Sequence, residues 1–182
     1  MKRSKASFNI AYSAITCALA LIVLFAAVIP SLIYIAPAFA GFVIWSVRAR
    51  TSAKHALLAF AATSILAAFL VPEIEGKIYF MFFFGYYPIL REAIHRIKSK
   101  LAQFAIKFAV FNAAAVSSFW LVVYVFGIAD VLGELTWGGE YALYVFWGMG
   151  NLAFVLYDFS LKQYFHAYEK WVVPVIDKKL SK

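Results

Sequence analysis

Aromatic and amide side chains recur at helical spacing in the last long apolar segment of the chain. Tyr144, Trp147 and Asn151 are separated by three and four residues, so in a helix they lie on one face. Stacked rings with a few polar groups are typical of a pocket for a small, ring-containing ligand. With aromatic residues of two earlier segments, the predicted ligand-binding residues are Tyr79, Phe83, Tyr86, Trp120, Tyr144, Trp147 and Asn151. The alternative is an aromatic belt at a membrane surface combined with ordinary packing.

Four polar residues, one of them the Asn151 already named, lie within apolar segments, where polar groups are costly and therefore informative. Asn112 and Asn151 lie about midway along two of these segments, where they would face a ligand cavity or hydrogen-bond between helices. Lys107 and Asp158 lie at similar depths near one side. They would form an ion or proton relay, a structural pair, or, for Lys107, a side chain that extends to the membrane surface.

The sequence carries no motif that indicates catalysis. His55, His95 and His166 lie at three separate helix ends, without the spacing of a metal site such as HExxH. No GxSxG, Walker A or CxxC motif is present, and Cys17 is the only cysteine. We therefore expect no enzyme activity, no metal, no cofactor and no ATP binding by a P-loop of this chain.

The composition is that of a membrane protein. Of the 182 residues, 65% are hydrophobic and 14% are charged, whereas soluble proteins average about 45–50% and 25%. The net charge of +8 comes from basic residues that flank apolar segments. Such a distribution orients a chain in the membrane and predicts contact with lipid, not with nucleic acid.

The apolar segments predict an all-α, polytopic domain over residues 1–182. About 20 apolar residues cross a bilayer, and fewer suffice where neighbouring helices shield them. The six predicted spans cover about 7–29, 36–47, 55–71, 78–94, 101–126 and 141–161, and an amphipathic cytoplasmic tail covers 162–182. The first segment is long enough to span the membrane, so we expect it to be retained as a helix and not removed as a signal peptide.

The charges next to the spans predict the orientation. Basic residues precede the first span, separate the second from the third and the fourth from the fifth, and follow the sixth. The opposite side carries Glu73, Glu75, Asp130, Glu134 and Glu140, with Lys77 as its one basic residue. Because positive residues stay inside, both termini are predicted to be cytoplasmic in a multi-pass protein of the plasma membrane of a bacterial cell.

Two segments near the predicted pocket are candidates for conformational roles. Gly85 and Pro88 interrupt the fourth span between an aromatic half and a basic half, so a kink is expected there. The loop 127–140 contains four glycines, three acids and Trp137. It is predicted to be either a lid over the pocket or a solvated connection.

The arrangement resembles the substrate-binding S components of energy-coupling factor (ECF) transporters. Six spans, both termini inside and a similar chain length carry the resemblance across most of the chain. The first span also contains an AxxxA pattern, Ala14 and Ala18, near its cytoplasmic end. In this family such small residues let the helix pack closely against the transmembrane T component.

The resemblance implies an importer subunit without an ATPase of its own. Substrate would enter from outside beneath loops 30–37, 72–77 and 127–140 to a site lined by spans four to six. The partners would be a T component, bound through Ala14 and Ala18, and two ATPase subunits. The acids of the outer side and the aromatic residues favour a vitamin-like, neutral or cationic nutrient. A non-transporting membrane scaffold or partner subunit is the alternative function.

Overall fold

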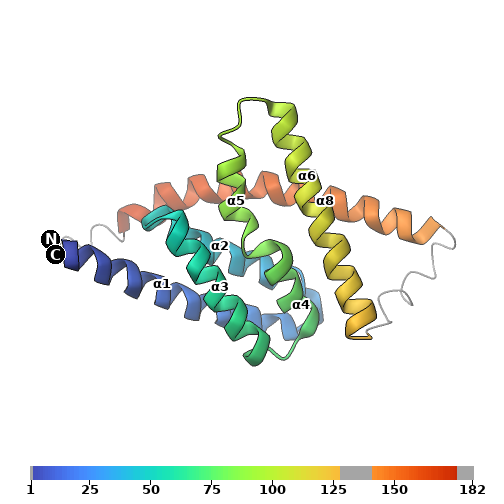
Figure 1. The fold of residues 1–182 in the computed structure, drawn as a ribbon, viewed down its shortest axis with the longest axis horizontal. Coiled ribbons are helices and arrows are strands. Elements are labelled where there is room, and N and C mark those ends of the chain that lie inside the picture. The colour runs from blue at the N-terminus through green and yellow to red at the C-terminus, as the bar shows by residue number, and fades with distance from the viewer. Residues whose placement is uncertain (1, 128–140, 176–182) are drawn as a thin grey trace. The chain divides into compact units, whose positions relative to one another are not determined.

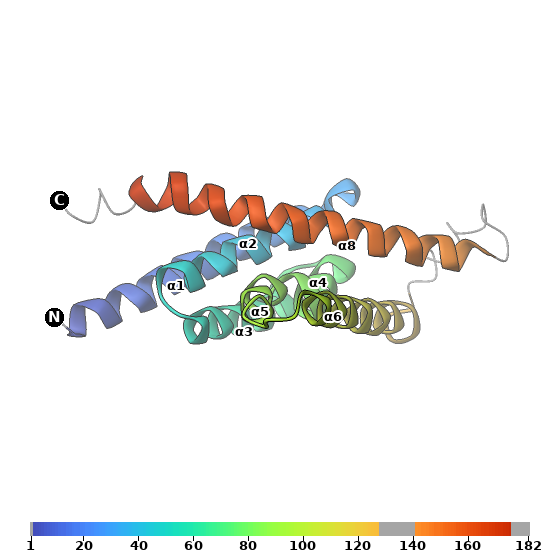
Figure 2. The ribbon, with the colours of Figure 1, turned by 90° about the horizontal axis from the view of Figure 1, so that it is seen from above.

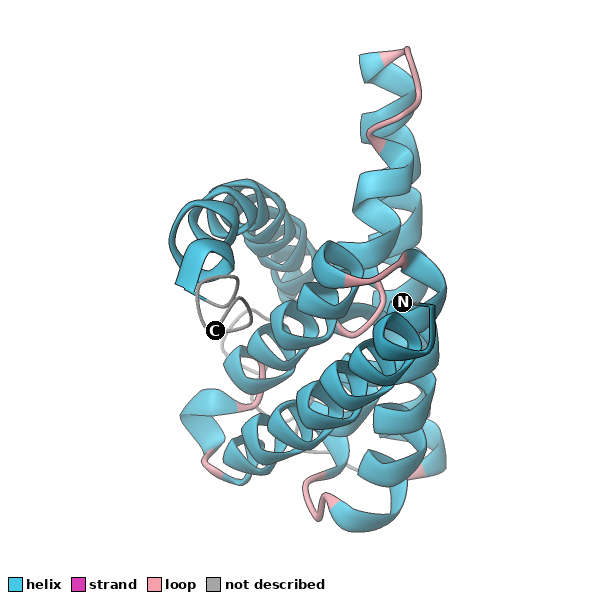
Figure 3. Ribbon diagram, turned by 90° about the vertical axis from the view of Figure 1, so that its left-hand side faces the viewer, coloured by secondary structure: helices cyan, strands magenta, loops and turns pink. Residues whose placement is uncertain are grey.

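The computed structural model describes residues 2–127 and 141–175. Within these residues the chain is helical and contains no β-strand, as the colouring of Figure 3 shows. The all-α prediction is confirmed at this level. The chain divides into two compact units, residues 1–128 and residues 129–182, and each is described by itself.

The described part of the first unit, residues 2–127, contains six α-helices and four short helical segments. Two of these segments, η1 and η2, are 3₁₀ turns that follow the first helix, and η3 and η4 are π-helical. The elements are α1 (Lys2–Phe25), η1 (Ala26–Val28), η2 (Pro30–Leu32), α2 (Ile35–Arg50), α3 (Ala53–Leu70), α4 (Ile74–Tyr79), η3 (Phe80–Phe84), α5 (Tyr87–Ile94), α6 (Lys100–Trp120) and η4 (Leu121–Val125).

Three helices of the described residues are long and apolar enough to cross a membrane. They are Lys5–Val28, Ala53–Leu70 and Lys100–Val125, which coincide with the first, third and fifth predicted spans. With 16 residues, α2 is only about 24 Å long, which is shorter than a typical hydrocarbon core. These helices indicate a membrane protein.

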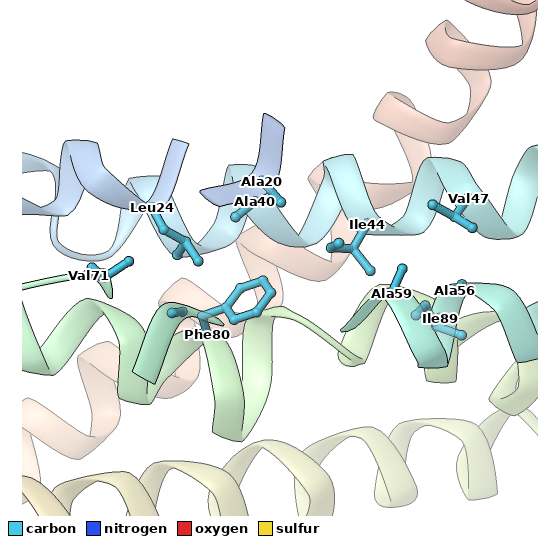
Figure 4. Close-up of a cluster of buried hydrophobic side chains, with 11 residues drawn as sticks. Ala20, Leu24, Ala40, Ile44, Val47, Ala56, Ala59, Val71, Phe80 and Ile89 are labelled. Carbon is cyan, nitrogen blue, oxygen red and sulfur yellow. The ribbon is translucent and has the colours of Figure 1, made fainter. Parts of the chain in front are cut away.

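Helices α1, α2 and α3 pack against one another, and α1 and α2 run side by side (Figure 1 and Figure 2). Most of α2 is buried, whereas α1 exposes Ile10, Ile15 and Ile22 on its outer face. The core contains Leu24 of α1 and Ile44 of α2, together with alanines of all three helices (Figure 4). The buried alanines let the helices approach closely.

The segment α4–η3–α5 packs on α2, and its η3 and α5 parts also contact α6. Gly85 N donates to the Phe80 carbonyl at 2.8 Å, an i→i−5 bond that closes the π-helical segment. A turn at Gly85 and Tyr86 follows, and α5 starts with Pro88 in its first turn. The helix is therefore interrupted at the place where Gly85 and Pro88 predict a kink.

Side-chain caps fix the starts of three helices of the first unit. The Ser52 hydroxyl accepts from His55 N, the Ser99 hydroxyl accepts from Ala102 N at 3.3 Å, and the Glu73 carboxylate accepts from two amides of α4. Each cap satisfies backbone donors that have no partner inside the helix. The loops before α3, α4 and α6 are thus held by specific hydrogen bonds.

The second unit contains α8 (Ala142–Ala167) and the π-helical η6 (Tyr168–Val172). Figure 2 shows α8 as one long helix. It continues without a break past Leu161, so it includes the first residues of the predicted tail 162–182. The predicted lid, 127–140, lies outside the described residues except for Gly127, which has a φ of 67°.

Candidate ligand-binding site

A cluster of two tyrosines and a glutamate lies where α4 meets the start of α2. Tyr79 Oη donates to Glu75 Oε2 at 3.2 Å, and the ring of Tyr79 stacks on that of Tyr34 with centroids 5.1 Å apart and planes at 23°. Glu75 and Tyr79 are one helical turn apart on α4, and Tyr34 immediately precedes α2. We call Tyr34, Glu75 and Tyr79 the tyrosine–glutamate cluster.

The residues next to this cluster hold α4 in place. The Glu73 carboxylate accepts from Glu75 N at 3.0 Å and from Gly76 N, so it caps the helix. Lys77 Nζ donates to the carbonyl of Val71 at 3.0 Å, which ties α4 to the end of α3. Two carboxylates, Glu73 and Glu75, thus lie within one turn of each other and give this end of the unit a negative potential.

The tyrosine–glutamate cluster offers both an aromatic face and a carboxylate. Tyr34 is 53% exposed, whereas Glu75 and Tyr79 are half-buried. A ring-containing ligand can stack on Tyr34, and a cationic or N–H group of the same ligand can be bound by Glu75. Such a combination of π-face and negative charge favours a cation over an anion.

Phe83 belongs to the core of the first unit. Its ring is 5% exposed and stacks on Tyr87 with centroids 4.6 Å apart. It also contacts the ring of Phe111 edge-on at 5.4 Å, and so joins η3 to α6. The predicted ligand contact at Phe83 is a packing contact in this structure.

Tyr86 lines an open groove between α6 and the segment η3–α5. The groove has a volume of ≈ 400 Å³. Its lining residues are Phe82, Tyr86, Leu90, Val110, Ala113, Ala114 and Ser117. The only side-chain polar atoms among them are the hydroxyls of Tyr86 and Ser117, and Ser117 Oγ donates to the Ala113 carbonyl at 2.8 Å. We call this feature the α5–α6 groove.

Trp120 ends α6 and is 56% exposed. Its ring lies 6.0 Å from that of Tyr124 in η4. The four predicted residues of the first unit are therefore distributed over different surroundings: Tyr79 in the tyrosine–glutamate cluster, Phe83 in the core, Tyr86 in the groove and Trp120 on the outside. The structure does not bring these four side chains together.

Tyr144, Trp147 and Asn151 lie on α8, in the second unit. Asn151 Nδ2 donates to the Trp147 carbonyl of its own helix at 3.0 Å. Asn112 likewise donates to the Phe108 carbonyl within α6 at 2.9 Å. A shared pocket between these α8 residues and those of the first unit stays a prediction.

The polar residues at the other end of the first unit form two contacts that the sequence did not single out. Glu92 of α5 accepts from Arg48 Nε at 2.6 Å and from Trp45 Nε1, both on α2. The nitrogen Lys107 Nζ lies 3.2 Å from His95 Nε2 and joins α6 to the end of α5. Glu92 is the one acid in a strongly basic stretch, and this is a signal that sequence reasoning could have used.

The remaining predictions on residues have different outcomes. Ala14 and Ala18 are exposed on α1, so they are accessible to another helix. Lys107 and Asp158 lie in different units, and their pairing stays a prediction. In the described part of the chain, no three His, Cys, Asp or Glu side chains come together to hold a metal ion.

Comparisons with known proteins assign no family to this chain. No protein-family model, no curated protein and no solved structure matches the chain. The similarity to S components therefore rests on the predicted topology, the charge distribution and the AxxxA pattern of the sequence.

Proposed function

We propose that the protein is the substrate-binding membrane subunit of an ECF-type importer, which captures a small, neutral or cationic nutrient from outside the cell. In this proposal six spans cross the plasma membrane and both termini are cytoplasmic. The three long apolar helices and the basic residues flanking the apolar segments support it.

The observation that carries the proposal is the tyrosine–glutamate cluster. Tyr34 follows α1 and Glu75 follows α3, so both lie on the predicted outer side, opposite the basic connections. An exposed ring beside a carboxylate fits a vitamin-like compound with a cationic or N–H-bearing ring. The carboxylate of Glu73, which lies close to Glu75, adds to the negative potential and disfavours the binding of anionic compounds.

The surface of α1 supports a role as a subunit. Ala14 and Ala18 are four residues apart and exposed, and Ile15 beside them is 62% exposed. Small residues at this spacing let a partner helix approach closely. The proposed partners are a transmembrane T component and two ATPase subunits, which supply the energy.

Ligand binding tests the proposal directly. The full chain in lipid nanodiscs is titrated with ring compounds of three charges, for example thiamine, riboflavin and folate, and binding is followed by tryptophan fluorescence and thermal shift. We expect the cationic or the neutral compound to bind without ATP.

We expect Glu75→Gln to weaken binding of the cation by about ten-fold or more, because hydrogen bonds to charged groups contribute about 1.5–3 kcal/mol. The control, Glu169→Gln, alters an exposed acid of the second unit and leaves binding unchanged. If no compound of a broad metabolite panel binds, the importer proposal is wrong.

The exposed alanines of α1 also favour a second candidate function, a non-transporting scaffold or partner subunit. The double variant Ala14→Phe and Ala18→Phe separates the two functions. In an importer it abolishes uptake that depends on the partner subunits and leaves ligand binding intact. In a scaffold it abolishes partner association, and no ligand binds to the wild type or the variant.

A further inference from the structure

Tyr79 makes two contacts of the tyrosine–glutamate cluster at once. Its hydroxyl donates to Glu75 Oε2 at 3.2 Å, and its ring stacks on that of Tyr34 with centroids 5.1 Å apart. A change of the Tyr79 rotamer would break both contacts together, so each contact restrains the other. Tyr79 therefore restricts how a ligand can use Tyr34 and Glu75.

The stack determines where a ligand ring can lie on Tyr34. Tyr79 covers one face of the Tyr34 ring, yet Tyr34 is 53% exposed, so its exposed surface includes the opposite face and the edge. The carboxylate of Glu75 lies on the Tyr79 side, because it accepts from the Tyr79 hydroxyl, which lies in the plane of that ring. A ligand ring stacked on the opposite face of Tyr34 is thus separated from Glu75 by the Tyr34 ring. The positive group of the ligand needs a spacer to reach Glu75 past the ring edge.

The hydrogen bond from Tyr79 also limits the shape of the positive group that Glu75 can bind. A guanidinium binds a carboxylate through two parallel N–H···O bonds, which use both carboxylate oxygens. An ammonium is a compact point charge and can bind through one oxygen. Because Tyr79 donates to Oε2, a guanidinium in this geometry has to displace the hydroxyl, whereas an ammonium does not.

The helix that carries Glu75 and Tyr79 is held firmly against its neighbours. Gly76 lies against the 3₁₀ turn after α1, because an added Cβ there would be 2.7 Å from Ala27 Cβ. Lys77 Nζ donates to the Val71 carbonyl at 3.0 Å and fixes α4 to the end of α3. The carboxylate therefore cannot follow a ligand without a movement of α4, and a fixed arrangement of groups selects ligands by their shape.

We propose that the ligand of this site is an aromatic amine whose ammonium group is carried on a short flexible arm, and that Tyr79 determines this specificity. The ring of the ligand stacks on the face of Tyr34 opposite Tyr79, and the ammonium reaches Glu75 past the edge of that ring. Compounds with a guanidinium on the same arm, or with the charge in the ring itself, bind more weakly. The inference rests on the proposed function of the cluster as the ligand site, and it narrows the cationic nutrients to one geometry.

Three cations test this geometry: phenethylamine, phenethylguanidine and N-methylpyridinium. The first two have the same ring and arm and differ in the terminal group, whereas the third carries its charge in the ring. Their affinities for the full chain in lipid nanodiscs are measured by isothermal titration calorimetry. We expect phenethylamine to bind roughly ten-fold or more tightly than either of the other two, which is the factor that one hydrogen bond to a charged group contributes.

Tyr79→Phe tests the role of the hydroxyl, because the ring and its stack on Tyr34 are retained. Without the hydroxyl, Oε2 accepts the second N–H of the guanidinium, so we expect the affinities for phenethylamine and phenethylguanidine to become nearly equal. The matched control is Tyr124→Phe, which removes an exposed hydroxyl in η4 and leaves the ratio of the two affinities unchanged. If Tyr79→Phe does not fold, as judged by circular dichroism, the ratio measured for the wild type decides the proposal.

Three results would overturn this inference and leave the proposed function in place. They are equal affinities of the wild type for the amine and the guanidine, a ratio that Tyr79→Phe does not change, and tighter binding of N-methylpyridinium than of phenethylamine. If none of the three cations binds but Glu75→Gln weakens binding of another metabolite, the proposed geometry alone is wrong. If no compound of the metabolite panel binds either, the proposed function is wrong as well.

Discussion

Gly41 occupies the closest approach between α2 and η3, and replacing it with alanine tests the packing of the first unit. A Cβ atom at this position would lie 2.0 Å from the carbonyl oxygen of Phe84 and 2.9 Å from its carbonyl carbon. Both atoms belong to the backbone, so the rotation of a side chain cannot relieve the clash. Gly41→Ala must therefore push α2 and η3 apart.

The size of the effect follows from this geometry. Ordinary contacts begin at 3.4 Å, so the oxygen would have to move by about 1.4 Å. Inserting an extra carbon into a packed core costs about 1–3 kcal/mol, and the backbone neighbour places this variant at the upper end. Alanine recovers about 1 kcal/mol of helix propensity relative to glycine. We expect a net loss of about 2 kcal/mol, which corresponds to a decrease in Tm of about 4–8 °C.

Thermal unfolding of the purified protein in one detergent, followed by circular dichroism, measures this effect. Gly148 in α8 provides the matched control, because an added Cβ there has no heavy atom within 4 Å. Gly148→Ala is expected to leave Tm unchanged or to raise it slightly. If Gly41→Ala and Gly148→Ala had the same Tm, the close crossing of α2 and η3 would be refuted.

Four further substitutions test the polar interior of the first unit by the same measurement. Glu92→Gln weakens the ion pair with Arg48 and is expected to lower the free energy of unfolding by about 1–2 kcal/mol, because Glu92 is one third exposed. When Glu92→Gln and Arg48→Gln are combined, the loss of stability should be smaller than the sum of the two single losses, and strict additivity would contradict a direct pair. Trp45→Phe removes the other donor to Glu92 and should cost about 1 kcal/mol, whereas an unchanged Tm would show that this hydrogen bond contributes nothing. Thr63 has a fully buried hydroxyl without a hydrogen-bond partner, so Thr63→Val is expected to raise stability by about 1 kcal/mol; a lower Tm would contradict this.

The long apolar runs of the sequence predict the helices of the first unit well. Helices α1, α3 and α6 coincide with predicted spans because each belongs to a predominantly apolar stretch of at least 18 residues. The interruption near Gly85 and Pro88 is also predicted, because these residues weaken a helix locally. The extensive burial of α2 is not predictable in this way, because a helix that is apolar on all sides has no hydrophobic periodicity that would indicate which face is buried.

The candidate site was less predictable, for a reason that lies in the π-helical segment. In a regular α-helix Tyr79, Phe83 and Tyr86 share one face. The i→i−5 bond from Gly85 to Phe80 adds a residue to the turn and rotates the following side chains by about 100°. Tyr79 lies before this segment and contacts Glu75 one turn earlier on α4, whereas Phe83 lies within it and packs on Phe111.

Contacts between distant segments account for the rest. The spacing of Glu75 and Tyr79 is visible in the sequence, but the stacking of Tyr34 on Tyr79 depends on how the 3₁₀ turns after α1 direct the chain. The hydrogen bonds from Trp45 and Arg48 to Glu92 likewise require that α2 and α5 lie side by side. Neither arrangement follows from local sequence.

The segment α4–η3–α5 thus combines requirements that one straight helix cannot meet. One end stacks Tyr79 on Tyr34, and the other places Glu92 against α2 and His95 against α6. These partners belong to different parts of the first unit, and a continuous α-helix fixes the angle between any two of its residues. The π-helical turn and the break at Gly85 change that angle, so the irregular backbone is what allows both ends to keep their partners.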